Sequence, residues 1–272
     1  MTIYALSTLT DDHQLRVFLS TDTDYAAYAL GDLEPPYDQH AQWVAASQKG
    51  AVEGLALLYT ALDPPLLFLM GDVPALSAIL MHGVGPDRIV FNARLEVEGV
   101  LDTFYDLQLV KTMLRMRVTS REFRPLSEED DSGKPERLSG KDADAINSLH
   151  EVASEHDKRS MDDVAFVPAM VDQGVYFGIR EDGQLIACAG THLVAKRAKL
   201  AALGNVVVHP EQRRRGLGRR VTHAVARHLL DSEINLVVLN VEKRNAAAVK
   251  LYESLGFGTG TEYIEGIAAR RS

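Results

Sequence analysis

The residues best suited to hold a charged ligand lie between a strand and a helix in the second half of the chain. Residues 203–208 end in a β-branched run, and Pro210 stops it because proline cannot continue a strand ladder. Three arginines at 213–215 and glycines at 216 and 218 then open an amphipathic helix. The first amides of a helix lack partners inside it, glycine lets a ligand approach closely, and arginine suits phosphate. The pattern predicts a pyrophosphate-binding loop.

A second strand and helix follow this loop. Residues 236–241 are apolar and β-branched, which predicts a buried strand. The next helix is expected at 245–255, because Asn245 is a good N-cap and Gly256 a good C′ residue. Tyr252 shares the apolar face of that helix with Ala248, four residues earlier.

Together the two stretches resemble the GNAT superfamily of N-acyltransferases. Neither a dinucleotide fingerprint nor a P-loop is present. The loop is similar to the GNAT signature [Q/R]-x-x-G-x-[G/A] through Arg213, Gly216 and Gly218. The helix is similar to the second GNAT motif, through Asn245, Ala248, Tyr252, Gly256 and Phe257. The resemblance extends from about residue 135 to the C-terminus.

The resemblance implies that the loop holds the pyrophosphate of acyl-coenzyme A, and that pantetheine runs along the preceding strand. Acetyl-CoA is the expected donor. Tyr252 is expected to give a proton to the leaving thiolate, the alternative being a core tyrosine with a satisfied hydroxyl. The coenzyme contacts implied are Val206, Val207, Val208, Arg213, Arg214, Arg215, Gly216, Leu217, Gly218, Arg219, Asn245, Ala248 and Tyr252.

The general base has several candidates. Some family members carry a glutamate on the strand before the loop, but the equivalent place here falls near Ala202, which cannot take a proton. Glu262, Glu265 and His192 could act directly or through water. Each could equally be an exposed or structural group, and a mechanism without a protein base is the alternative.

Composition limits the classes of function. The chain has 272 residues and a formal net charge of −9, which argues against general binding to nucleic acid or anionic membranes. Cys188 is its one cysteine, so no internal disulfide forms and a reducing, cytoplasmic location is expected. We expect no membrane span and no secretory signal. We also expect no metal, because the histidines lack metal-ligand spacing. No pattern predicts the oligomeric state.

The first half repeats the order of elements of the second. Its strands and helices predict a mixed α/β fold at 1–125, a linker at 126–139 and a GNAT-like domain at 140–272. The first half is thus either a degenerate GNAT-like copy or an unrelated α/β domain, and the order of elements alone leaves both open. Met70, Gly71 and Asp72 stand where the phosphate loop stands later, and Asp72 would repel phosphate. The copy is expected not to bind coenzyme.

These observations predict an acyl-CoA-dependent N-acyltransferase. The acceptor expected is a primary amine of a small molecule or an amino acid, acylated directly in a ternary complex. The alternative is a regulatory module that binds acyl-CoA without turnover, which the missing carboxylate near Ala202 favours and Tyr252 opposes.

Overall fold

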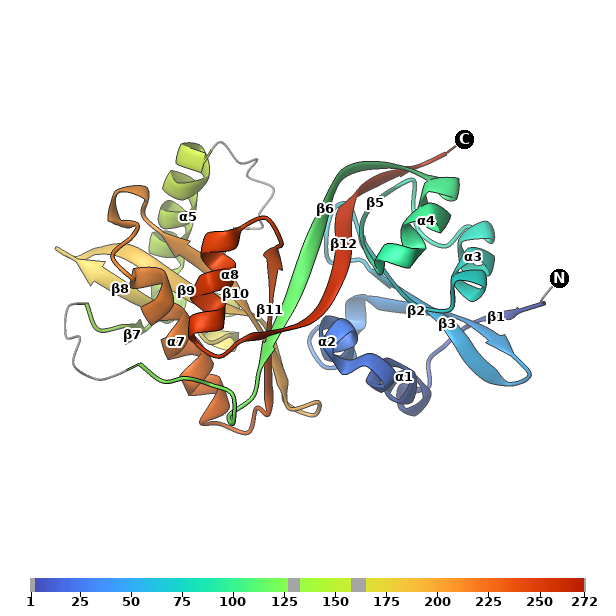
Figure 1. Cartoon of the computed structure of the whole chain (residues 1–272), viewed down its shortest axis with the longest axis horizontal. Coiled ribbons are helices and arrows are strands. Elements are labelled where there is room, and N and C mark those ends of the chain that lie inside the picture. Colours follow the sequence, from blue (N-terminus) through green and yellow to red (C-terminus); the bar gives the residue numbers. More distant parts are fainter. Residues whose placement is uncertain (1–2, 127–132, 158–164, 272) are drawn as a thin grey trace. The chain divides into compact units, whose positions relative to one another are not determined.

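The computed structural model describes residues 3–126, 133–157 and 165–271 and shows a mixed α/β fold (Figure 1). Contacts group the chain into two compact units. The first comprises Met1–Arg115, Val241–Asn245 and Thr259–Ser272, and the second comprises Met116–Asn240 and Ala246–Gly258. Residues 259–272, which the sequence suggested belong to the second domain, therefore group with the first unit.

The first unit is built on a mixed sheet. Its last strand along the chain lies inside the sheet, because β12 pairs antiparallel with β5 from Ile264↔Ala93 to Ala269↔Arg88. In sheet order the strands are β1 (Ala5–Thr8), β2 (Ala41–Gln48), β3 (Ala51–Tyr59), β4 (Leu66–Gly71), β5 (Arg88–Ala93), β12 (Gly258–Arg270) and β6 (Tyr105–Val118).

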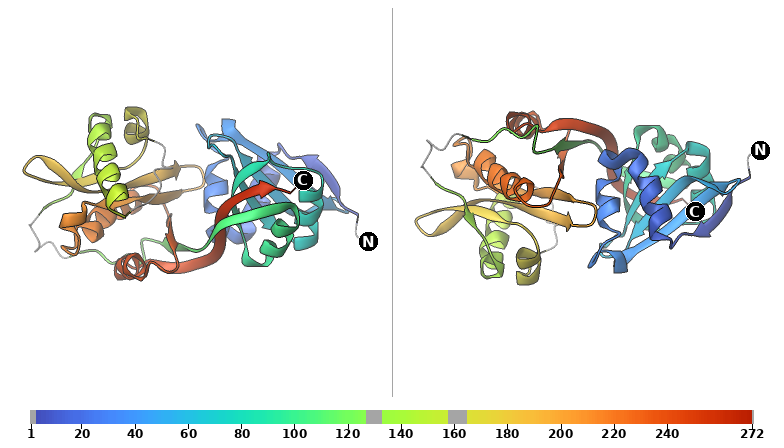
Figure 2. Two further views of the ribbon diagram at one scale, coloured as in Figure 1. Left: turned by 90° about the horizontal axis from the view of Figure 1, so that it is seen from above. Right: turned by 90° about the horizontal axis from the view of Figure 1, so that it is seen from below.

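Helices cover both faces of this sheet, with α1 and α2 on one side and α3 and α4 on the other (Figures 1 and 2). Asp11 and Asp22 cap the first two, each accepting a hydrogen bond from a first-turn amide. The helices are α1 (Asp12–Leu19), α2 (Thr23–Gly31), α3 (Val73–Met81) and α4 (Glu98–Phe104), with short 3₁₀ turns at Ser20–Asp22, Asp38–His40 and Leu95–Val97.

The second unit has the same layered plan. Helices α5 and α6 lie on one face of its sheet, and α7 and α8 lie on the other (Figure 2). An Asp–Gly pair between two apolar runs predicts a hairpin turn at Asp182–Gly183. This turn is confirmed, since both residues adopt the positive φ that a tight hairpin requires. In sheet order the strands are β11 (Leu236–Glu242), β10 (Leu200–Val208), β9 (Gln184–Ala195), β8 (Phe177–Glu181) and β7 (Glu136–Arg137). The helices are α5 (Ala143–Asp157), α6 (Pro168–Gln173), α7 (Leu217–Leu230) and α8 (Ala246–Ser254), with 3₁₀ turns at Gly140–Asp142 and Pro210–Gln212.

The repeated order of elements is confirmed. The run β3–β4–α3–β5–α4–β6 matches β9–β10–α7–β11–α8–β12 element by element. The amphipathic pattern of residues 95–108 predicts a helix over that whole range, and this prediction is wrong at its end, because α4 ends at Phe104 and Tyr105 begins β6. Tyr105 is extended, its N–H donates to the Leu101 carbonyl, and its hydroxyl donates to the Val84 carbonyl at 3.1 Å. The sequence also predicts a helical segment at 161–171. Residues 161–164 lie outside the described residues, 165–167 are not helical, and α6 begins at Pro168 and continues to Gln173.

Backbone contacts fill the place in the first unit that corresponds to the phosphate loop. Gly71 has a φ of 123°, and a Cβ there would collide with the Glu53 carbonyl oxygen. That same oxygen accepts a hydrogen bond from the Asp72 amide at 2.8 Å. The Asp72 amide is therefore already hydrogen-bonded within the fold, and the backbone at Glu53 occupies the space next to Gly71 that a phosphate would need. Both observations support our proposal that this copy binds no coenzyme.

Substitution of Gly71 should therefore destabilise the first unit. We expect Gly71→Ala to lower the free energy of unfolding by about 2–4 kcal/mol, from backbone strain and the clash with Glu53. Gly50→Ala is the matched control, because Gly50 also has a positive φ (85°) but faces open space, so about 1 kcal/mol is expected. Urea unfolding followed by the fluorescence of Trp43, the chain's one tryptophan and buried in β2, measures both. Equal losses in the two variants would contradict the prediction.

Candidate coenzyme A site

Strand β10 leaves part of one edge open. Within the described residues its parallel pairing with β11 runs from Leu200↔Leu236 to Leu203↔Leu239 and then stops. On its other side β10 stays paired with β9 as far as Val208↔Ala187. Residues Val206–Val208 are half-buried and present backbone groups along this edge. An open strand edge can hydrogen-bond an extended amide-containing ligand, as pantetheine is.

The predicted phosphate loop leads directly from this edge into α7. Arg214 and Gly216 have positive φ values of 68° and 76°. The first hydrogen bond of the helix runs from the Arg220 amide to the Gly216 carbonyl at 3.2 Å, so the amides of Leu217–Arg219 come before it and have no acceptor within the helix. Gly216 is exposed, and a Cβ there would meet nothing within 4 Å. The loop therefore brings helix N-terminal amides next to the open side at Gly216, an arrangement that can bind an anion.

Gly218 has a different task from Gly216. It is buried, and a Cβ there would lie 3.3 Å from Leu251 Cδ1 and 3.4 Å from Val208 Cγ2. Its missing side chain allows α7 to pack closely against α8 and β10. Gly218 therefore has a packing role, while its amide remains among the helix N-terminal amides that we expect to contact the coenzyme.

The three loop arginines are not equivalent. Arg213 makes a two-pronged ion pair with Asp157 at the end of α5, at 2.7 and 3.0 Å. Arg215 pairs in the same way with Glu181 at the end of β8, at 3.0 and 3.3 Å, and its hydrogen bonds lower the pKa of Glu181. Arg214 is exposed and makes no ion pair within the described residues. Arg213 and Arg215 therefore fasten the loop, and Arg214 is the arginine available to a phosphate.

This difference predicts unequal effects on coenzyme binding. Arg214→Asn should raise the Kd for acetyl-CoA about fivefold, because it removes a charge while asparagine tolerates the positive φ. Arg215→Gln should have a smaller effect, since that side chain is already held by Glu181. Isothermal titration at two salt concentrations measures both, and the slope of affinity against salt should fall in Arg214→Asn. A larger loss for Arg215→Gln would reverse the assignment.

A groove of about 1070 Å³ continues from the loop along α7. Its surroundings are positively charged: burial, Arg227 and Arg219 together lower the pKa of His223. The His223 Nε2 accepts a hydrogen bond from the Leu126 amide at 3.1 Å, which requires that nitrogen to be unprotonated. The charge around the groove adds to the attraction of the loop for phosphate.

Tyr252 lies two residues before the end of α8, which is Ser254. The helix ends at Ser254, and Gly256 takes the predicted C′ position with a positive φ. The Phe257 amide donates to the Tyr252 carbonyl and the Gly256 amide donates to the Glu253 carbonyl, which is the Schellman arrangement. The Tyr252 and Phe257 rings pack at 6.1 Å, and burial raises the pKa of Tyr252 to about 12. Its hydroxyl therefore keeps its proton at neutral pH. Asn245 directly precedes the helix.

The three candidate bases fall in different parts of the molecule. Glu262 and Glu265 lie on β12 in the first unit, whereas the loop, Tyr252 and His192 all lie in the second. Glu262 is ion-paired to Lys243 at 2.8 Å. Burial raises the pKa of Glu265, against the opposing effects of Lys111 and Arg115. His192 is exposed on β9, beside β10.

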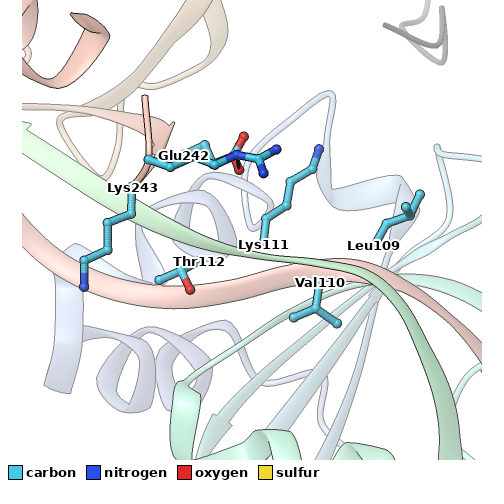
Figure 3. Close-up of a pocket in the computed structure, with 7 residues that line it drawn as sticks. Leu109, Val110, Lys111, Thr112, Glu242 and Lys243 are labelled. Atoms are coloured by element: carbon cyan, nitrogen blue, oxygen red, sulfur yellow. Dashed lines mark ion pairs between the residues drawn. The ribbon is translucent and has the colours of Figure 1, made fainter. Parts of the chain in front are cut away.

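A second hollow, of about 530 Å³, lies in the first unit (Figure 3). Figure 3 shows that the side chains around it diverge: Glu242 and Lys111 extend to one side of the strands, and Thr112 and Lys243 extend to the other. Two of its charged residues are already paired, Lys243 with Glu262 and Glu242 with Arg244. Because its polar groups do not converge, we assign no site to it.

Comparisons with known proteins agree with this geometry. The family model described as Acetyltransferase (GNAT) family matches residues 143–257. The [ribosomal protein bS18]-alanine N-acetyltransferase of Escherichia coli K12 is 38% identical over 89 residues, which are 31% of this chain and 55% of that enzyme. The mycothiol acetyltransferase of Paenarthrobacter aurescens is 34% identical over 88 residues, 31% of this chain and 27% of that enzyme. The match thus spans about half of the E. coli relative.

Solved structures are similar in fold to almost the whole chain. A GCN5-related N-acetyltransferase from Sphaerobacter thermophilus has a TM-score of 0.66 at 14% identity and covers 99% of this chain and 96% of its own. A tandem GNAT protein from the clavulanic acid biosynthesis pathway has a TM-score of 0.60 at 14% identity, with 98% of each chain covered. Within the described residues, no helix is long and apolar enough to cross a bilayer, and no three His, Cys, Asp or Glu side chains gather as metal ligands would.

Proposed function

We propose that the protein transfers an acetyl group from acetyl-CoA to a primary amine, because the model of the GNAT acetyltransferase family matches residues 143–257. The observation that carries the proposal is the open edge of β10 leading into the anion seat of α7. Coenzyme A is an extended ligand with amides at one end and a pyrophosphate at the other. The amides match the open edge of β10, and the pyrophosphate matches the free amides at the start of α7.

In this proposal the second unit holds the coenzyme. The amides of Leu217–Arg219 and the Arg214 side chain take the pyrophosphate, and the edge at Val206–Val208 takes pantetheine. A backbone amide of that edge can also stabilise the oxygen of the tetrahedral intermediate. These contacts leave the thioester to react directly with an amine in a ternary complex.

Two side chains of the second unit serve the proton transfers. His192 takes a proton from the attacking amine, and Tyr252 gives its hydroxyl proton to the leaving thiolate. His192 is preferred to Glu262 and Glu265 because it lies in the same unit as the loop, whereas both glutamates lie in the first unit. No glutamate on β10 serves as the base in this proposal, since β10 contains none and the equivalent position falls near the buried Ala202.

The acceptor is proposed to be a primary amine of a small molecule or an amino acid. The two named relatives support an amine acceptor of some kind, because one is named for acetylating a ribosomal protein alanine and the other is named a mycothiol acetyltransferase. The alternative remains a regulatory module that binds acyl-CoA without turnover. It is favoured by Ala202, which removes the carboxylate found in some family members.

A thiol-release assay distinguishes the acetyltransferase from the regulatory module. Acetyl-CoA is incubated with the protein and, in turn, glycine, glucosamine, putrescine and a tetrapeptide beginning with alanine. Release of coenzyme A that depends on one amine, with the acetylated amine seen by mass spectrometry, supports the enzyme. Tight binding of acetyl-CoA by calorimetry without release in any mixture supports the regulatory module.

A further inference from the structure

Two irregularities in the β9–β10 pairing bring three polar side chains together. The register shifts between Ala202 and Leu203, where His192 is the extra residue on β9, and again between Gly204 and Val207. Asn205 lies in the second irregularity with a φ of 53°. Bulges of this kind redirect side chains and are common near active sites. Here they lie directly before Val206–Val208, the edge proposed for pantetheine.

Paired glycines make room for two rings at this point. Gly204 and Gly190 are opposite each other on the two strands. A Cβ on Gly204 would collide with the His192 ring, and a Cβ on Gly190 would collide with the Tyr176 ring. Residues opposite each other in a sheet face the same side. The histidine and tyrosine rings therefore lie over one face of the sheet, at neighbouring positions.

Asn205 connects the two rings by hydrogen bonds. Its Nδ2 donates to the Tyr176 hydroxyl at 3.2 Å, and its Oδ1 lies 3.2 Å from His192 Nε2. The Tyr176 hydroxyl in turn donates to the backbone carbonyl of Thr191 at 2.9 Å. Tyr176 is buried, with 2% of its surface exposed, so this end of the chain of bonds is fixed.

The carbonyl at one end sets the direction of every bond. A carbonyl can only accept, so the single hydroxyl proton of Tyr176 goes to Thr191. The tyrosine oxygen must then accept from Asn205, which turns the amide nitrogen toward Tyr176 and the amide oxygen toward His192. An amide oxygen also only accepts, so His192 Nε2 must carry a hydrogen. In the neutral imidazole the lone pair is then on Nδ1.

We propose that Asn205 is a positioning residue that holds His192 in the Nε2–H tautomer, so that Nδ1 is the atom that takes the proton of the acceptor amine. This inference rests on the proposed function. In the step, the amine nitrogen forms a bond to the thioester carbonyl carbon and the carbon–sulfur bond breaks. The proton lost by the amine goes to His192 Nδ1, and the thiolate takes a proton from Tyr252. No further reactant is needed.

Asn205→Gly tests the proposal without straining the backbone, because glycine accepts the positive φ. It removes the amide and should lower kcat about tenfold or more with the KM for acetyl-CoA nearly unchanged. Asn205→Asp keeps an acceptor facing Nε2 and also tolerates the positive φ, so its loss of kcat should be smaller. Lys199→Gly is the matched control: Lys199 is an exposed turn residue with a φ of 52°, and its replacement should leave kcat as it is.

The tautomer itself is read by long-range ¹H–¹⁵N spectra of the free protein, with the His192 signals assigned through His192→Gln. The proposal is supported if the wild type and Asn205→Asp show the Nε2–H tautomer and if Asn205→Gly loses both this tautomer and kcat. An Nδ1–H tautomer in the wild type, or an unchanged kcat in Asn205→Gly, overturns it. A wild type that releases no coenzyme A with any amine of the panel contradicts the proposed function instead, and the catalytic role of Asn205 with it, while the spectra still report the tautomer.

Discussion

Replacement of Gly216 by aspartate should weaken acetyl-CoA binding about 100-fold. The side chain at this position would stand on the open side of the loop, next to the amides of Leu217–Arg219. A carboxylate about 5 Å from a phosphate charge costs roughly 3 kcal/mol at an effective dielectric of about 20, which corresponds to about 100-fold in Kd. Isothermal titration with acetyl-CoA and with free coenzyme A measures the loss.

Gly216→Asn is the control that isolates this charge. Asparagine has the same shape as aspartate, and both residues tolerate the left-handed conformation that Gly216 adopts. We expect Gly216→Asn to weaken binding less than about tenfold, since it adds only bulk and some backbone strain. Equal losses in the two variants would mean that shape, not charge, governs the position. Unchanged binding in Gly216→Asp would place the pyrophosphate elsewhere.

The anion seat could be predicted from sequence because its chemistry is local. Pro210 ends the strand, Gly216 supplies the positive φ, and the helix that follows supplies the amides, all within ten residues. The helix end at Gly256 was predictable for the same reason, because the Schellman bonds span only six residues. Motifs of this length carry their own geometry.

Features that depend on distant partners could not be predicted. Nothing in residues 259–272 indicates that they pair with β5, since a strand's partner is set by the whole sheet. Tyr105 fits a helical pattern in sequence, yet its hydroxyl bonds to Val84 and its ring packs under Arg270 in the first unit. The different contacts of the loop arginines also depend on partners far along the chain, which are Asp157 for Arg213 and Glu181 for Arg215.

The general-base candidates include one feature that the sequence could predict and one that it could not. Sequence selected His192, Glu262 and Glu265 by residue type alone, and the structure places only His192 in the unit that carries the loop. Asn205 was read as part of a strand end, and nothing local distinguished it. Its position became meaningful only when the bulges brought it against His192 and Tyr176. The paired glycines at 190 and 204 were the available signal, because two glycines within apolar strands indicate a close approach of other groups.

Tyr252→Phe is expected to lower kcat about 100-fold while the Kd for acetyl-CoA stays within about twofold, since loss of a general acid costs 10²–10⁴. The variant keeps the ring that packs on Phe257 and the backbone bonds that end α8, so the fold should be retained. Only the proton donor is removed. Stopped-flow or steady-state thiol release gives kcat, and calorimetry gives Kd.

The pH dependence of the same variant strengthens the test. Burial raises the pKa of Tyr252 to about 12, so the hydroxyl is protonated over the whole working range and activity in the wild type should not fall from ionisation of Tyr252 below about pH 11. Tyr105→Phe is the matched control, because Tyr105 is equally buried but lies in the first unit and bonds to Val84. It should leave kcat unchanged. A Tyr252→Phe protein with wild-type turnover would make Tyr252 a core residue and leave protonation of the thiolate to water.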